Sequence, residues 1–455
     1  MGTVGLSFGS PTSGQGFDVA TTVAQIQAAS SAIENPWNSE LTALKAQDSV
    51  FTALGSDLST LTTSIQTLTD FDGVFSEKEG SSSDSNTLAL TSASTSAVAG
   101  SHTILVNSLA TTSSSVSGTV ANAGDKLSGN VVITVNGKTQ TIAADGDTLS
   151  DLAAAINSAG AGVTASLLTD PTGSRLSLVS STSGAAGQID VSTSTLSDAG
   201  QAIGFTTQTG KDGSITVDGA PLTVSSNTVT DAIPGVTFQL LAQSAGTSPV
   251  QIQITNDNTD VETAVNNFVN AYNAVAKDLT AQTGDNASGN PEPLAGTPLL
   301  SQLQSSLSSA LFAGAASGSI NSLEQLGISV NSDGSGTLAL DSDTLDSALN
   351  NNFSDVTGFF QNANSFGQSL ASTLNNLDTQ APGGAIFLAQ QQNSSQESAL
   401  NTDITNENAL LATQKTQLTT ELNEANQILQ SIPSQLDEVN SVFDSVTGFN
   451  PNEQD

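Results

Sequence analysis

The sequence predicts an α+β multidomain protein in which helices from both chain ends enclose nested antiparallel β-rich domains. Both ends carry apolar residues that are alternately four and three positions apart, whereas the middle alternates with period two and is rich in Ser, Thr and Gly. The 4-3 spacing places one apolar stripe along a helix, and such a stripe needs a partner helix. Period-two alternation predicts strands with one buried face.

Composition sets the outer limits. The 455 residues are enough for about three or four domains. The formal charge is −35, from 43 acidic against 8 basic residues, and the basic residues are scattered singly. Without a basic patch, binding to nucleic acid or to an anionic membrane surface is not expected. No run approaches 18 apolar residues, so we expect no membrane insertion.

Cysteine usage and the chain start bear on location. The sequence has no cysteine, which excludes disulfides and thiolate metal sites. The first twenty residues lack the basic and apolar regions of an ordinary secretory signal. The sequence therefore predicts a cytoplasmic protein or one exported by another route, and its scarce aromatics and abundant Ser, Thr and Gly favour an exported surface protein.

Two helices are predicted before residue 80. Asp18 is placed as the N-cap of a helix that starts at Val19. Pro36 should interrupt it, because the residue before a proline avoids the helical region. A second helix then covers 41–68 and stops near Gly73. The N-terminal apolar row consists of Val19, Val23, Ile26, Ile33, Trp37, Leu41 and Leu44.

The middle of the chain is predicted to be nested β structure. Asn136-Gly137 and Asp218-Gly219 each separate two strand-like runs, and both pairs suit two-residue hairpin turns. One helix is expected at 149–156. Strands within 87–110 and 212–255 should pair across an insertion at 115–210. The predicted inner β domain is therefore 80–114 plus 211–255, and the outer β-rich domain is 115–210.

Helices return after residue 256. Thr259 and Glu262 form a capping-box pattern at the start of a helix that reaches Leu279. Further helices are predicted at 300–311, 343–350 and 353–377, with a strand pair at 328–330 and 338–340. The last helix spans about 395–445 and would be roughly 75 Å long at 1.5 Å per residue. We assign 41–79 plus 256–394 to a helical bundle, and 1–40 plus 395–455 to a terminal helical leg.

No constellation of catalytic residues is present, so we predict that the protein is not an enzyme and needs no cofactor or metal. His102 is the only histidine and lies in a predicted strand, which disfavours a Ser-His-Asp triad. No phosphate-binding loop motif occurs. Three acidic clusters do not fit a calcium loop and are interpreted as helix caps and turns. They are Asp145, Asp147 and Asp151; Asp333, Asp341 and Asp343; and Asp257 with Asp260.

The apolar stripes carry the functional prediction. We expect 41–68 and 261–279 to bundle with each other, but 19–33 and 411–443 to pack on other molecules and to be largely disordered in the isolated subunit. Asn408, Lys415 and Pro433 interrupt the C-terminal stripe, which suits a segment that rearranges. The candidate assembly residues are Val19, Val23, Ile26, Ile33, Leu411, Leu418, Leu422, Leu429, Ile432, Leu436, Val439 and Phe443.

Several motifs, taken in order, resemble the flagellar filament cap family, also called hook-associated protein 2. They are GFDV at 16–19, VNGK at 135–138, GVTAS at 162–166, NTVTDAIPGVTFQL at 227–240 and FVNAYN at 268–273. The LGI at 326–328 and LALD at 338–341 complete the set. This chain departs from the family in the uncharged segment 33–37 and in Pro433.

The resemblance implies a homo-oligomeric ring at the distal tip of the bacterial flagellum. Such a ring retains exported flagellin and promotes its folding and insertion. The implied partners are other copies of this chain, flagellin, a flagellar export chaperone, the type III export apparatus and the hook-associated junction proteins. Two alternatives stay open from the sequence: a structural hook–filament junction protein, and a surface adhesin that acts through the β domains.

Overall fold

The computed structural model describes residues 16–447, which form two compact units. The helical unit comprises the described residues up to Gln66, Asn266–Ala348 and the described residues from Asn352 onward. The β unit comprises Thr67–Val265 with Leu349–Asn351. The β unit is therefore inserted between two helical halves of the chain, which is the nesting that the sequence predicts.

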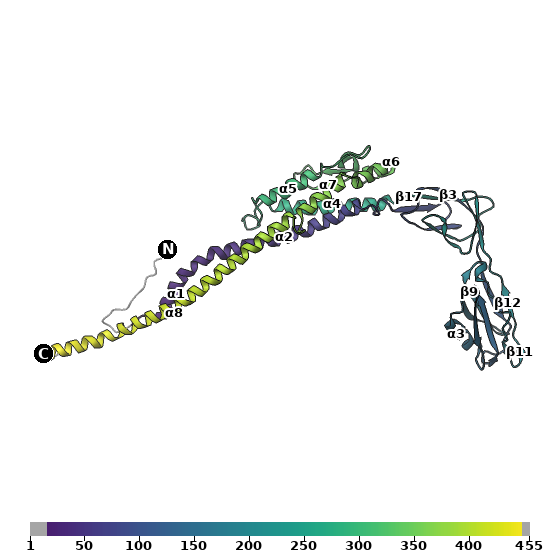
Figure 1. Cartoon of the computed structure of the whole chain (residues 1–455), viewed down its shortest axis with the longest axis horizontal. Coiled ribbons are helices and arrows are strands. Elements are labelled where there is room, and N and C mark those ends of the chain that lie inside the picture. Colours follow the sequence, from purple (N-terminus) through teal and green to yellow (C-terminus); the bar gives the residue numbers. More distant parts are fainter. Residues whose placement is uncertain (1–15, 448–455) are drawn as a thin grey trace. The chain divides into compact units, whose positions relative to one another are not determined.

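The helices are mostly long (Figure 1). Their bounds are α1 Val19–Ser30, α2 Glu34–Thr69, α3 Leu149–Ala159, α4 Asn258–Ala281, α5 Pro298–Ala310, α6 Ser342–Gln361, α7 Phe366–Leu377 and α8 Ala385–Thr447. Short 3-10 turns occur at Ser31–Ile33, Ala185–Gly187 and Leu323–Leu326. A small hairpin of β18 (Ile328–Val330) and β19 (Leu338–Leu340) lies within the helical unit, as predicted.

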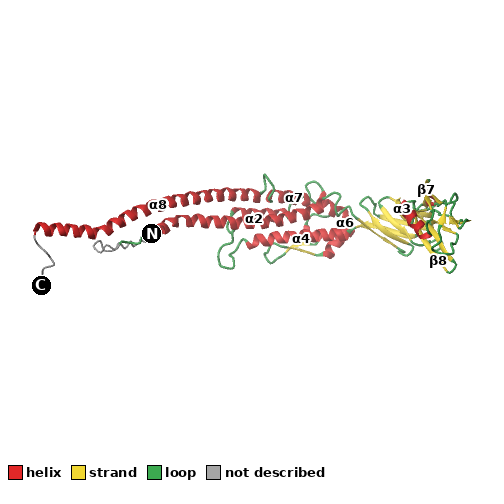
Figure 2. Cartoon of the chain, turned by 90° about the horizontal axis from the view of Figure 1, so that it is seen from below, coloured by secondary structure: helices red, strands yellow, loops and turns green. Residues whose placement is uncertain are grey.

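Aromatic rings fill the centre of the helical unit. Phe366 stacks on Phe359 with ring centroids 5.2 Å apart. It also meets Phe360 and Phe268 edge-on at 5.9 and 6.2 Å. Six leucine and isoleucine side chains of α2 are buried in the same unit, and Figure 2 shows α2 beside α4 and α8. Asp57 of α2 and Asp278 of α4 belong to this unit, and burial, followed by the hydrogen bond and charge of Asp278, raises the pKa of Asp57. The predicted bundling of the two helices is confirmed.

Buried polar contacts fix the register of α8 in this bundle. Asn393 is 7% exposed and donates from its side-chain amide to Asp48 at 3.0 Å and to Gln47 at 3.3 Å. Gln47 in turn donates to the carbonyl of Pro293 at 3.1 Å. Because buried polar groups are costly without partners, these contacts specify one alignment of α2 against α8.

The inner part of the β unit has a five-stranded and a three-stranded antiparallel sheet, in the orders β1-β17-β3-β13-β14 and β15-β16-β2. β3 pairs with both β13 and β17, and β2 pairs with β16, so 87–110 does pair with 212–255. The bounds are β1 Lys78–Ser82, β2 Leu88–Ala93, β3 Gly100–Ser108, β13 Gly213–Val217, β14 Ala220–Val224, β15 Thr228–Ile233, β16 Val236–Leu240 and β17 Val250–Asn256.

The outer part has its own core, with α3 against a sheet of order β12-β4-β9-β8. Asn136 and Gly137 have φ values of 47° and 74°, which the two-residue turn between β6 and β7 requires. The bounds are β4 Thr112–Ser117, β5 Leu127–Ser128, β6 Asn130–Val135, β7 Lys138–Ala143, β8 Val163–Asp170, β9 Gly173–Ser183, β10 Ser197–Asp198, β11 Gln201–Ala202 and β12 Phe205–Gln208.

Some predicted helix ends were wrong. Pro36 does not interrupt a helix; it is the third residue of α2, where a backbone N–H has no helical partner to lose. Thr259 is not the cap of α4, because the carboxylate of Asp257 accepts the Asp260 N–H at 3.1 Å. The segment 353–377 is broken between α6 and α7.

The final helix is longer than predicted. α8 has 63 residues and starts at Ala385 rather than near 395. At 1.5 Å per residue it is roughly 95 Å long. α2 runs unbroken across 40/41, where the predicted leg meets the predicted bundle. The four-domain division stays a prediction.

Candidate assembly surface

The first and last helices, α1 and α8, meet as an antiparallel pair. α1 lies along α8 (Figure 1). The N–H of Phe17 donates to Asn426 Oδ1 at 2.9 Å, and Gln27 Nε2 donates to the carbonyl of Leu411 at 2.8 Å. Asp18 caps α1 as predicted, through the N–H of Thr21 at 3.2 Å.

Part of the predicted assembly row is buried within this pair. Val23 is 2% exposed, Leu411 8% and Val19 9%. Ile26, Leu418, Leu422, Leu429 and Ile432 are half-buried. The expectation that 19–33 is unstructured in the single chain is therefore wrong, because α1 finds its apolar partner in α8. Ile33 is not buried by α8, since it is 56% exposed in the 3-10 turn after α1.

The C-terminal part of α8 carries an apolar stripe whose side chains are exposed. Leu436, Val439 and Phe443 are 43%, 64% and 57% exposed, and three neighbours of the same face are also exposed. Those neighbours are Ile428, Val442 and Val446. We name the segment Ile428–Val446 the distal stripe. Six apolar side chains of this segment are exposed, and three of them, Leu436, Val439 and Phe443, belong to the predicted assembly residues.

The polar interruptions of the C-terminal row face solvent. Asn408 donates to the carbonyl of Ile404 on its own helix at 2.9 Å, and Lys415 is exposed. α8 continues through Pro433, whose missing N–H leaves the carbonyl four residues earlier without its usual helical partner. The proline therefore weakens the helix locally at the start of the distal stripe.

Most acidic clusters act as caps and turns, as interpreted from the sequence. Asp151 and Thr148 form a capping box at α3, Asp341 caps α6, and Asp333 accepts from Ser335 in a turn. The N–H of Thr148, and then its hydroxyl, donate hydrogen bonds to Asp151 and so lower the pKa of that carboxyl.

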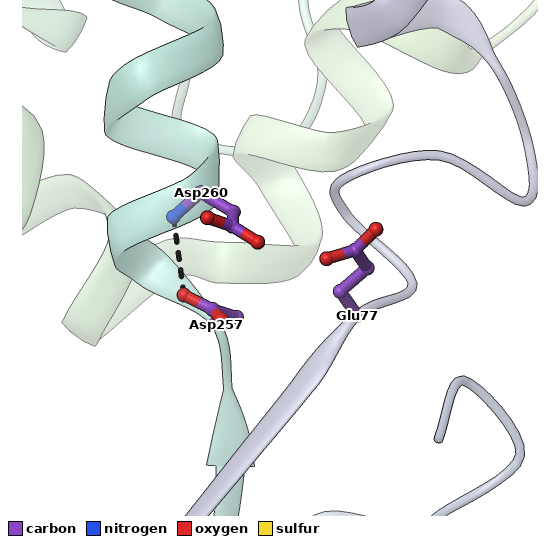
Figure 3. Close-up of side chains that lie close together, drawn as sticks. All are labelled: Glu77, Asp257 and Asp260. Carbon is purple, nitrogen blue, oxygen red and sulfur yellow. Dashed lines mark hydrogen bonds between the residues drawn. The ribbon is translucent and has the colours of Figure 1, made fainter. Parts of the chain in front are cut away.

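One acidic cluster gains a member that the sequence analysis missed. Ligand oxygens of Glu77, Asp257 and Asp260 lie within 4.8 Å of one another (Figure 3). A shared hydrogen bond with Asp260 raises the pKa of Glu77, as do its partial burial and the charges of both aspartates. Glu77 lies just before β1, 180 residues from its partners, and only the antiparallel pairing of β1 with β17 brings it there.

His102 takes part in a turn rather than in a triad. Its Nδ1 lies 2.7 Å from Asp218 Oδ2. The same carboxylate accepts the N–H of Thr103 at 2.7 Å. These bonds, with the bond to His102 foremost, lower the pKa of Asp218. The cluster joins β3 to the β13–β14 turn, where Asp218 has a φ of 48°.

The helical unit also has a hollowed apolar surface around Phe312, which the sequence analysis missed. Phe312 is 80% exposed, and Val330 is 47% exposed beside it. Both line two hollows of about 410 and 420 Å³. Phe312 follows the end of α5 and breaks no sequence pattern, so nothing in the sequence marks it as exposed.

Comparison with known proteins identifies the family. The model of the flagellar hook-associated protein 2 N-terminus matches residues 15–113, and that of the C-terminus matches 210–434. The flagellin hook IN motif matches 130–182. The B-type flagellar hook-associated protein 2 of Pseudomonas aeruginosa is 33% identical over 362 residues, covering 72% of this chain and 73% of the relative. The chain belongs to the flagellar hook-associated protein 2 family.

Other relatives agree. The flagellar hook-associated protein 2 of Escherichia coli K12 is 28% identical over 370 residues, covering 75% of this chain and 78% of that protein. The crystal structure of the flagellar cap protein FliD D1-D2-D3 domains from Escherichia coli has a TM-score of 0.57 at 26% identity. It covers 76% of this chain and 99% of that one. The predicted family and the α+β multidomain class are thus confirmed.

Two further findings bear on the assembly surface. The C-terminal family match ends at residue 434, so Leu436, Val439 and Phe443 lie beyond it. Among residues 16–447, no helix combines the length and apolar character needed to cross a membrane.

Proposed function

We propose that this protein caps the flagellar filament as a homo-oligomeric ring at its distal tip. In this role it retains exported flagellin and promotes the folding and insertion of flagellin during elongation. The role is structural and uses no cofactor. The family membership supports a flagellar cap, and the distal stripe supports contact with other helices.

The observation that carries the proposal is the difference between the two parts of α8. Where α1 covers it, the apolar row is buried or half-buried. Beyond Asn426 the helix continues with five aliphatic side chains that are 43% to 80% exposed. Exposed apolar patches of this kind mark interaction sites. A cap whose terminal helices engage the filament end needs such a surface.

The proposed export route is the flagellar type III apparatus, with an export chaperone that covers the terminal helices before assembly. Once outside, the protein meets the hook-associated junction proteins first and flagellin afterwards. The formal charge of −35 would keep free copies apart before assembly through mutual repulsion.

Removal of the gene tests the proposal. We expect cells without filaments and flagellin monomers in the medium, because nothing retains the exported subunits. Normal filaments in this mutant would refute the cap assignment. Electron microscopy of the purified protein should show rings, and monomers at all concentrations would contradict the oligomeric part.

A labelled copy of the protein separates a cap from a hook–filament junction protein. A cap stays at the growing tip, so gold-labelled antibody should mark the free filament end. A junction protein would be marked between hook and filament instead.

A further inference from the structure

The distal stripe also indicates what kind of surface receives it. This inference rests on the proposed function, since it concerns the same part of α8. The stripe has five exposed aliphatic residues. They are Ile428 (63% exposed), Leu436 (43%), Val439 (64%), Val442 (58%) and Val446 (80%).

The width of the stripe exceeds that of a two-stranded coiled-coil seam. Successive residues of an α-helix are separated by about 100°, so the exposed aliphatic residues from Val442 to Leu436 cover an arc of about 120°. A two-stranded coiled coil needs only two apolar positions in seven. An arc wider than about 100° is typical of a helix that faces a core formed by several elements. The distal stripe therefore fits between two helices rather than against one.

α1 does not cover this stripe. Within the described residues, the segment just before α1 meets α8 at Asn426 and Gln430, through Gly16 and the N–H of Phe17. The exposed residues Leu436 to Val446 follow on the C-terminal side of that contact. The surface thus continues an established helix–helix contact, and its five aliphatic side chains are exposed.

The charges around the stripe indicate the chemistry of the partner. The segment 421–447 contains five acidic residues and no Lys or Arg. Glu438 and Asp444 lie on opposite sides of the stripe, one beyond each edge at helical spacing. Copies of this segment side by side would therefore bring like charges together. A partner with basic residues along its rim would bring opposite charges together instead.

We propose that the distal stripe docks into an aliphatic groove between two helices of another protein, with Lys or Arg along both rims of that groove. The groove covers the aliphatic residues, and its basic rims meet Glu438 and Asp444. A single helix would leave part of the arc in water. A second copy of α8 would add acidic residues to an acidic surface.

The test uses the full chain and a designed helical hairpin as the probe. The hairpin has two antiparallel helices, an Ile/Leu/Ala groove and Lys along both rims. We expect it to bind at least about tenfold more tightly than a twin with Glu rims, and than one of its helices alone. The affinity should fall as salt is added.

Matched variants locate the binding on α8. Val439→Asn and Val442→Asn should each lower the affinity for the Lys hairpin by at least about tenfold. The control Ser441→Asn, on the opposite face of the same turn, should change it by less than about twofold. Val442 is the discriminating position, because it lies at the edge of the arc that a single helix would leave uncovered.

Three outcomes overturn the inference. They are equal binding of the single helix, equal binding of the Glu-rimmed twin, and self-association through α8 that excludes the hairpin. None of these outcomes depends on filament growth. The cap assignment fails only if the gene-removal mutant grows normal filaments, so the two failures are distinguishable.

Discussion

Replacement of Phe366 by Ala should destabilise the helical unit far more than the same replacement at Phe312. Phe366 is fully buried and touches three other phenylalanine rings at centroid distances of 5.2 to 6.2 Å. Phe312 belongs to the same unit but is 80% exposed. The pair compares one chemical change at a buried and an exposed position.

The expected magnitude follows from burial and ring contacts. Phe→Ala in a core costs about 3–5 kcal/mol, through lost burial and the cavity that remains. Each aromatic contact adds about 0.5–1.5 kcal/mol beyond burial, which favours the upper part of this range. We therefore expect at least about 4 kcal/mol for Phe366→Ala. For Phe312→Ala we expect less than about 0.5 kcal/mol, as for most surface changes.

Hydrogen exchange of the intact chain, followed by mass spectrometry, measures the effect. Amides of α4 and α7 should exchange about a thousandfold faster in the Phe366 variant, because 1.4 kcal/mol corresponds to a factor of ten. Amides of the outer β core should be unchanged. A loss below about 1 kcal/mol, or equal effects of the two variants, would refute the account of this core.

Three experiments on ionisable side chains test other parts of the structure. Burial raises the pKa of Tyr272, the only tyrosine, to about 12, so its absorbance should titrate near that pH. Because the unfolded pKa is 10.0, stability should fall as pH rises above 10, and titration near 10 in the folded protein would contradict the burial. Glu77→Gln removes an acid whose pKa is raised above 4.5, so it should stabilise the β unit at pH 7 and lose that advantage below about pH 4. A destabilised variant in urea unfolding at pH 7 would show that the carboxylates do not repel each other. Hydrogen bonds with His102 and Thr103 lower the pKa of Asp218 from 3.8. These bonds should therefore stabilise the β13–β14 turn above pH 3.8, and the stabilisation should be lost as the pH falls below the lowered pKa. Asp218→Asn should make the amides of β13 exchange faster at pH 7, and an unchanged rate would contradict this role.

Local sequence patterns predicted the β nesting well. The turn at Asn136-Gly137 requires positive φ, and few residues tolerate it, so the pattern determines the hairpin. Pairing of β3 with β13 and β17 follows from the alternation of both segments. Helix ends were harder to place. Pro36 illustrates why, because a proline is a breaker inside a helix but suits its first turn, and sequence alone does not fix where that turn begins.

The assembly surface was only partly predictable. One 4-3 apolar pattern runs along α8, yet Leu411 is buried and Val439 is exposed. The difference depends on how far α1 extends beside α8, which the pattern of either segment does not contain. Glu77 was missed for a related reason, since only the pairing of β1 with β17 brings it to Asp257. Long-range contacts decided both cases.

Filament growth by variants of the distal stripe tests the central claim most directly. The gene-removal mutant receives a gene for the double variant Leu436→Asp/Val439→Asp. A second strain receives a gene for the control variant Ser441→Asp, which lies on the opposite face of α8. Charges in the stripe oppose its burial against other helices, whereas a charge on the opposite face stays in water. We predict flagellin monomers in the medium and no filaments for the double variant, and normal filaments for the control, with both proteins exported equally. Normal filaments from the double variant would contradict the claim that the exposed stripe of α8 is the assembly surface.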